Sequence, residues 1–230
     1  MSMQQLGIIL GMMQELNLRV RKMSDSALIG MANKLNVAEA LVVDMYLHKA
    51  IISQVKAEEN IFVSQSDTLP AAGWADLSKQ IHRKVAEAFV AETRFDPLHS
   101  AHSDQALFDQ IVLALHQENP QENYRFMVEH EGRSFNIDYP LSELEKNCEN
   151  WVSSIGLKLE AHMGKKCYLS DRARRVPGLL SSLKELGVNY ELLAPGIAAA
   201  NAARFGEQFE TAEGETVGMV REIPLRFNEE

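Results

Sequence analysis

Asp96, His99 and His102 form the densest group of potential metal ligands in the sequence. The two histidines are three residues apart, so one helical turn would place both imidazoles where they could meet a zinc ion together with the carboxylate. The alternative is a polar connector, in which Asp96 begins a turn and Ser103 caps the next helix. Because no cysteine or second pair of ligands accompanies the group, the spacing favours the connector.

A second group of reactive side chains is basic and surrounds a short apolar stretch. Its members are Lys165, Lys166, Arg172, Arg174 and Arg175. Arginines at the start of a helix could bind a phosphate or an acidic partner. The alternative is that the five cations are solvated ends of loops, where single charges contribute little. No aromatic residues are interleaved with them, so we expect no binding of nucleic acid by base stacking.

The sequence contains no nucleophile in a catalytic setting. Cys148 falls in a predicted helix and Cys167 in a predicted buried strand, so we expect both thiols to lie in the core. There is no Gly-x-Ser-x-Gly elbow of the kind that exposes a catalytic serine. The carboxylates lie on predicted exposed helix faces and do not form an acid–base pair.

The composition indicates a globular protein and argues against binding to nucleic acids or membranes. The chain has 230 residues, of which 46% are hydrophobic and 24% charged, as in globular proteins that bury a core. A net charge of -9 opposes general affinity for nucleic acids and anionic lipids. Two cysteines do not make a disulfide framework, and the longest apolar stretch of the N-terminus, Leu6 to Met13, is far shorter than the about 20 residues that cross a bilayer. We therefore expect a cytoplasmic protein that does not associate with membranes.

Helices and strands must position these residues, and hydrophobic periodicity predicts where they fall. Helices are expected over residues 3–16, 24–32, 76–95, 104–116, 141–163, 177–186 and 195–209. Strands are expected over residues 18–23, 40–46, 50–56, 60–65, 124–130, 133–139, 167–169, 189–193 and 216–227. The short links between residues 40 and 65 indicate antiparallel hairpins. Pro140 with Ser142-x-x-Glu145 predicts a capping box at the start of the 141–163 helix.

Three hairpin-linked strands followed by helix, strand, helix, strand and helix are the element order of a ribonuclease-H-like fold. The segment Tyr168–Leu179 is similar to the adenosine motif of the actin/Hsp70/sugar-kinase superfamily, and Leu192–Ala203 is similar to the helix that follows that motif. Leu41–Asp44 resembles the start of the family's second phosphate motif. Over about residues 5 to 206 the chain therefore resembles one nucleotide-binding lobe of this superfamily.

The resemblance implies an α/β fold, with a ribonuclease-H-like mixed sheet, flanking helices and an inserted helix-plus-hairpin subdomain. Residues 1–36 would be a helix–strand–helix remnant of the preceding lobe, and residues 37–68 and 141–210 would form the lobe itself. Residues 69–140 would be the inserted subdomain and residues 211–230 a C-terminal tail or edge strand. Because the first lobe would be mostly absent, an apolar face should be exposed unless a partner protein or a second copy covers it.

The resemblance also implies a nucleotide site, and the chain departs from the family pattern there. The residues that would bind nucleotide are Asp44, His48, Ser170, Asp171, Arg172 and Arg174. Glycines in phosphate loops let backbone amides approach oxygen atoms, but none occurs in Met45-Tyr46-Leu47-His48, and Asp171-Arg172 replaces those of the adenosine motif. The carboxylate of Asp171 would also repel a phosphate.

These departures predict a lobe that has kept its fold and lost its chemistry. We expect a non-catalytic module without a cofactor, which binds a protein partner or forms a homo-oligomer. The alternative is an enzyme, either a residual ATPase that uses Asp44 with ATP and Mg²⁺ or a metal-dependent hydrolase that also uses the Asp96–His102 segment.

Overall fold

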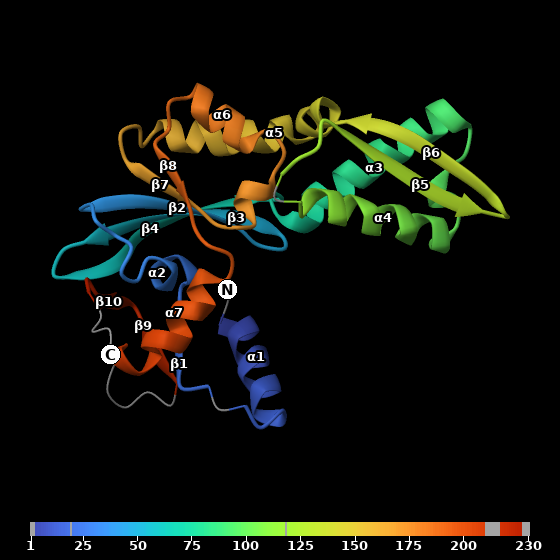
Figure 1. The fold of residues 1–230 in the computed structure, drawn as a ribbon. Coiled ribbons are helices and arrows are strands. Elements are labelled where there is room, and N and C mark those ends of the chain that lie inside the picture. Colours follow the sequence, from blue (N-terminus) through green and yellow to red (C-terminus); the bar gives the residue numbers. More distant parts are fainter. Residues whose placement is uncertain (1–2, 19, 118, 210–216, 227–230) are drawn as a thin grey trace. The chain divides into compact units, whose positions relative to one another are not determined.

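A computed structural model describes residues 3–18, 20–117, 119–209 and 217–226 of the chain, and Figure 1 shows its ribbon. The helices are α1 Met3–Glu15, α2 Ser26–Gly30, α3 Trp74–Thr93, α4 Ala101–Leu115, α5 Leu141–Glu160, α6 Leu179–Glu185 and α7 Ile197–Phe205. The strands are β1 Lys22–Ser24, β2 Glu39–Met45, β3 Lys49–Ala57, β4 Asn60–Pro70, β5 Asn123–His130, β6 Arg133–Pro140, β7 Lys166–Leu169, β8 Tyr190–Leu192, β9 Gly218–Val220 and β10 Glu222–Pro224. The predicted α/β class is confirmed.

The largest sheet is mixed. Its six strands follow the order β10-β4-β3-β2-β7-β8. Strands β7 and β8 are parallel, with Leu169 opposite Leu192, whereas β10 is antiparallel to β4, with Ile223 opposite Ile61. The predicted strand over 18–23 is shorter than expected, since only Lys22–Ser24 forms β1, and β1 pairs with β9 in a separate parallel ribbon.

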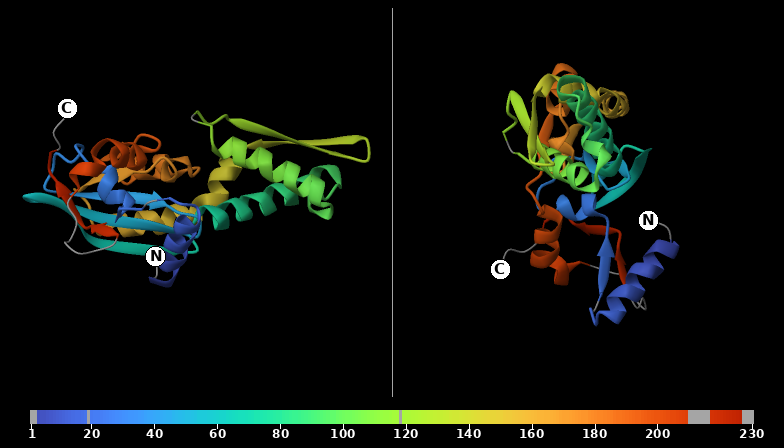
Figure 2. Two further views of the ribbon diagram at one scale, coloured as in Figure 1. Left: turned by 90° about the horizontal axis from the view of Figure 1, so that it is seen from below. Right: turned by 90° about the vertical axis from the view of Figure 1, so that its right-hand side faces the viewer.

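The chain divides into two compact units. Unit 1 comprises residues 1–40, 54–65 and 196–230, and unit 2 comprises residues 41–53 and 66–195, so that β2, β3 and β4 contribute residues to both. In unit 1, α2 packs against α7. In unit 2, α5 and α6 lie over β7 and β8, while α3 and α4 run beside the β5–β6 hairpin (Figure 2).

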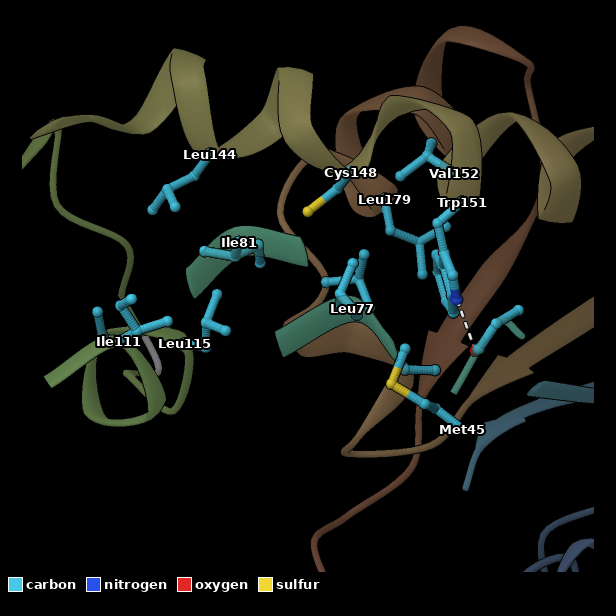
Figure 3. Close-up of a cluster of buried hydrophobic side chains, with 14 of the residues drawn as sticks. Met45, Leu77, Ile81, Ile111, Leu115, Leu144, Cys148, Trp151, Val152 and Leu179 are labelled. Atoms are coloured by element: carbon cyan, nitrogen blue, oxygen red, sulfur yellow. Dashed lines mark hydrogen bonds between the residues drawn. The ribbon is translucent and has the colours of Figure 1, made fainter. Parts of the chain in front are cut away.

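The core of unit 2 forms where the apolar faces of its helices meet the sheet (Figure 3). Leu77 and Ile81 of α3 point toward Leu144 and Cys148 of α5, as their spacing of three to four residues predicts. Trp151 of α5 donates a hydrogen bond from Nε1 to the carbonyl of Ala72, at 2.6 Å. This bond satisfies the polar atom of a large indole that is otherwise surrounded by apolar groups.

The helix starts show which capping predictions hold. Asp25 caps α2, because its side chain accepts a hydrogen bond from the amide of Ala27 at 2.8 Å. The predicted capping box at Ser142 is wrong: Pro140 is the N-cap of α5, and no side chain caps it. Instead, the Leu141 amide donates to the carbonyl of Glu122 at 2.9 Å, so the start of β5 supplies the acceptor.

The C-terminal prediction is met in part. A single strand was expected over residues 216–227, and the chain forms two short strands, β9 and β10, of which β10 is an edge strand. Residues 211–216 and 227–230 of the predicted tail lie outside the described residues. Within the described ranges, no helix has both the length and the apolar character that crossing a bilayer requires.

Both thiols are buried, as predicted, and burial raises the pKa of the Cys148 and Cys167 thiols to about 12. Because unfolding returns these pKa values toward their ordinary value of 9.0, the unfolded chain loses thiol protons that the folded chain retains. Stability from the neutral thiols is therefore fully present below about pH 9 and falls as the pH rises toward 12. We expect urea unfolding to show this decline from about pH 9 toward about pH 12.

A variant with both cysteines replaced by alanine is the matched control for this pH dependence. It should be less stable at neutral pH, because alanine leaves space in the core, but its stability should decline less with rising pH. An equal decline in the two proteins would show that other groups cause the pH dependence.

Candidate functional site

The candidate site lies where the C-terminal ends of β2 and β7 meet. The amide of Ser170 donates to the carbonyl of Val43 at 2.9 Å, so the turn after β7 begins beside Asp44. Ser170 also shapes that turn, because its Oγ accepts from the amide of Ala173 at 3.1 Å. A short 3-10 helix, η2 Ala173–Arg175, follows. Ser170 therefore helps to hold the turn between β7 and η2.

Arg172 and Asp44 form an ion pair at the centre of the site. One guanidinium nitrogen, Nη2, lies 3.1 Å from Oδ1 and 3.0 Å from Oδ2 of Asp44. The Asp44 side chain is 9% exposed and that of Arg172 is 54% exposed, while the Arg172 Cζ lies 5.1 Å from the centre of the Tyr46 ring. Since arginine keeps its charge at all accessible pH values, Asp44 has a permanent counter-ion within its own chain.

Asp171 binds the next two arginines of the turn. Its Oδ1 accepts from Nε of Arg174 at 2.9 Å, and its Oδ2 accepts from Nη2 of Arg175 at 2.6 Å. Burial alone would raise the pKa of Asp171, but the hydrogen bonds from both arginines outweigh burial, and the pKa is lower than the ordinary value of 3.8. Asp171 therefore stays ionised at neutral pH, as the prediction of phosphate repulsion requires.

These pairs change how the basic cluster of residues 165–175 is understood. Arg172, Arg174 and Arg175 each pair with a carboxylate, and Lys166 lies 2.7 Å from Glu191. Four of the five cations of the cluster are therefore compensated by carboxylates of the chain itself. Its capacity to attract a free anion is much lower than the sequence alone indicates.

His48 lies in the exposed turn between β2 and β3, where its backbone packs against Gly73. The sequence reasoning missed Tyr46 as a member of the site and considered Arg175 only as part of the basic cluster. The sequence contained a signal for each. Tyr46 is two residues from Asp44, which puts both side chains on one side of an extended chain. Arg175 is four residues from Asp171, which is the spacing of ion pairs in helices.

An open pocket of about 240 Å³ adjoins the 174–178 turn. Its apolar lining includes Leu115, Tyr124, Leu141, Val176, Pro177 and Leu180. Its charged lining is Glu145, Arg174 and Arg175, and both arginines already bind Asp171. The pocket is smaller than most ligand sites, which occupy about 300–1,000 Å³. Its lining suits a small apolar group better than a phosphate chain.

The Asp96–His102 segment has the geometry of the polar connector. Asp96 accepts a hydrogen bond from the amide of Leu98 at 2.9 Å, which begins the 3-10 helix η1 Pro97–His99. Ser100, and not Ser103 as predicted, is the N-cap of α4. His99 and His102 are exposed, and among the described residues no three His, Cys, Asp or Glu side chains gather as a metal site requires. The structure lends no support to a metal centre here.

No family model matches the chain. A search of curated proteins also finds no matching sequence. The resemblance to the actin/Hsp70/sugar-kinase superfamily thus depends on its motifs and on the order of its elements.

Proposed function

We propose that this chain is a degenerate, non-catalytic lobe of the actin/Hsp70/sugar-kinase type that works as a protein-binding or scaffold module. The Arg172–Asp44 ion pair carries the proposal. Phosphoryl transfer in such a lobe depends on positioning phosphates, a metal ion and a water molecule, and Asp44 is the one carboxylate implied to take part. In this chain that carboxylate is buried and bound to a guanidinium.

The strand order supports the ribonuclease-H-like part of the proposal. In the largest sheet, β4-β3-β2-β7-β8 are neighbours in this order, which places three consecutive strands beside two later ones. The two later strands are parallel, and α6 connects them. Between β4 and α5 lie α3, α4 and the β5–β6 hairpin, which is the composition expected of an inserted helix-plus-hairpin subdomain.

The charges around the adenosine-like turn support the loss of nucleotide chemistry. Asp171 replaces a position where the family has a glycine, and its carboxylate remains ionised because two arginines bind it. Glu145 adds a second carboxylate to the adjoining pocket. Two carboxylates near a triphosphate oppose its binding by Coulomb repulsion, while the nearby arginines are already engaged.

Thermal unfolding with and without millimolar Mg-ATP tests this proposal. We expect no change in Tm, because a ligand raises Tm only when it binds the folded state. A nucleotide at 100 times its Kd would stabilise the fold by about 2.7 kcal/mol, which is a shift of several degrees for a chain of this size. Mg-ADP and magnesium alone separate effects of the nucleotide from effects of the metal.

Phosphate release from ATP gives the proposal a second, independent test. The matched variant is Asp44→Asn, which removes the charge of the implied catalytic carboxylate with little change of shape. In the proposed scaffold, both proteins release phosphate at the rate of buffer alone. A nucleotide-dependent rise in Tm, or a rate that Asp44→Asn abolishes, would establish the residual ATPase and overturn the scaffold.

A further inference from the structure

Helix α1 is unusual among the described helices because none of its described apolar side chains is buried. From Gln4 to Glu15 no residue is buried. Five of the fifteen exposed large hydrophobic side chains of the described chain lie between residues 8 and 18, namely Ile8, Ile9, Met12, Leu16 and Leu18. Concentrated exposed apolar surface of this kind marks an interaction site more often than scattered single residues do.

Helix α1 also lacks the means to be stable alone. It has 13 residues, no acidic residue in its first turn and no basic residue in its last. Isolated helices shorter than about 12–15 residues are marginal in water, and Gly7 and Gly11 weaken this one further. A helix with this composition needs packing on its apolar side, and its exposure shows that the described residues of unit 1 do not provide it.

The surface of α1 carries both halves of a helix–helix contact. Ile8, Met12 and Leu16 are spaced by four residues and form one projecting ridge. Gly7 and Gly11 have the same spacing and form a notch beside it, where a Cβ on either glycine would have no atom within 4 Å. Next to α1 lies an open pocket of about 430 Å³ that is lined mainly by Leu10, Leu18, Val20 and Val217.

We propose that α1 is a self-association element, which pairs with α1 of a second copy of this chain. The ridge Ile8–Met12–Leu16 of each copy packs against the Gly7–Gly11 notch of the other. A two-fold contact uses the same patch twice, so a patch that holds both a ridge and a groove is self-complementary. Ridges and grooves that both repeat every four residues interlock in the commonest class of helix packing.

Charge favours a second copy over a charged partner. Residues 4–14 carry no charged side chain, although the whole chain has a net charge of -9. Two copies can therefore meet over residues 4–14 without like charges in contact, whereas an acidic or basic partner would find no charge there to pair with. Since α1 is only about 20 Å long, the contact is smaller than a standard interface, and the expected Kd is about micromolar or weaker.

The inference names a partner for the proposed binding module, but it depends on the exposure of α1 and not on the superfamily resemblance. Sedimentation velocity of the whole chain, from about 1 to about 200 μM, tests it. The mass should rise from 25.8 kDa toward twice that value. Added salt should strengthen the dimer, because salt screens repulsion between two acidic chains. A single species at 25.8 kDa throughout this range would overturn the proposal. It would leave the nucleotide test unaffected.

Two charge variants locate the contact. Ile8→Glu with Met12→Glu puts two carboxylates on the ridge, and we expect association to weaken at least about tenfold. Leu113→Glu with Leu157→Glu is the matched control, because it adds the same charge at two side chains of unit 2 that are each 68% exposed. If the α1 variant associates as tightly as the control, the contact lies elsewhere and the proposal is wrong.

The Gly11→Leu variant tests whether the notch is needed for association, without lowering the stability of the helix. Leucine favours the helix more than glycine does, and in the single chain it meets no neighbour, so α1 should remain folded. The leucine fills the notch, however, and should weaken association about tenfold. Unchanged association of Gly11→Leu would contradict the ridge-in-notch packing.

Discussion

Replacing Gly73 with alanine is expected to lower the free energy of unfolding by about 3 kcal/mol, a large loss for a single methyl group. Gly73 is the N-cap of α3, and a Cβ there would overlap the backbone of His48 and Lys49. The cost is steric and not conformational, because φ at Gly73 is -92°, which alanine adopts readily. Urea unfolding of the variant and the parent chain measures the difference.

The close approach at Gly73 exists because the β2–β3 turn caps α3 with backbone carbonyls. The amide of Trp74 donates to the carbonyl of Tyr46 at 2.9 Å, and that of Ala75 donates to Leu47 at 2.8 Å. No side chain caps α3, so these two bonds satisfy amides that a serine or aspartate would otherwise bind. An added methyl group would push the turn away and break both bonds.

Gly206→Ala is the matched control for Gly73→Ala. Gly206 has an ordinary φ of -58°, and a Cβ there would have no atom within 4 Å. This variant should be as stable as the parent chain or slightly more stable, since alanine restricts the unfolded chain. Equal midpoints for Gly73→Ala and Gly206→Ala would show that α3 does not lie against the turn.

The elements that sequence analysis predicted well are those set by local patterns. Leu77, Ile81 and Val85 recur at helical spacing, and they indeed line the buried face of α3. The Glu131-Gly132 pair predicted the hairpin turn, where both residues have positive φ. Each of these signals lies within a few residues of the structure that it determines, so no knowledge of the rest of the fold is needed.

The features that were missed depend on contacts between distant segments. Sequence analysis did not identify the close contact at Gly73, because its neighbours at the β2–β3 turn lie about 25 residues earlier in the chain. The capping box at Ser142 failed because a carbonyl of Glu122 satisfies the helix start. The parallel pairing of β1 with β9 joins residues near opposite ends of the chain, and no local pattern specifies such a pair.

The candidate site was predicted as a set of residues but not as a set of contacts. Asp44 and Arg172 were each named as part of a nucleotide site, yet they lie 128 residues apart and bind each other. Asp171 was expected to repel phosphate, and the structure adds that two arginines hold its carboxylate. Residue types thus indicated which groups matter, while the fold determined that they neutralise one another.

Removing Arg172 should destabilise the chain more than removing the charge of Asp44. Arg172→Met leaves a carboxylate that is only 9% exposed without its cation, and we expect a loss of about 1–3 kcal/mol. Asp44→Asn leaves a guanidinium that is 54% exposed, which water can solvate, so the loss should stay below about 1 kcal/mol. Urea unfolding of both variants at neutral pH measures this asymmetry.

The double variant Arg172→Met with Asp44→Asn shows whether the ion pair causes the asymmetry. Once the carboxylate is neutral, the missing guanidinium should matter little, so the double variant should be more stable than Arg172→Met alone. Losses that simply add would mean that Arg172 stabilises the turn by packing on Tyr46 and not by neutralising Asp44. Recovery in the double variant would instead show that the guanidinium serves as the built-in counter-ion of Asp44, the carboxylate that the proposed superfamily resemblance implies for nucleotide chemistry.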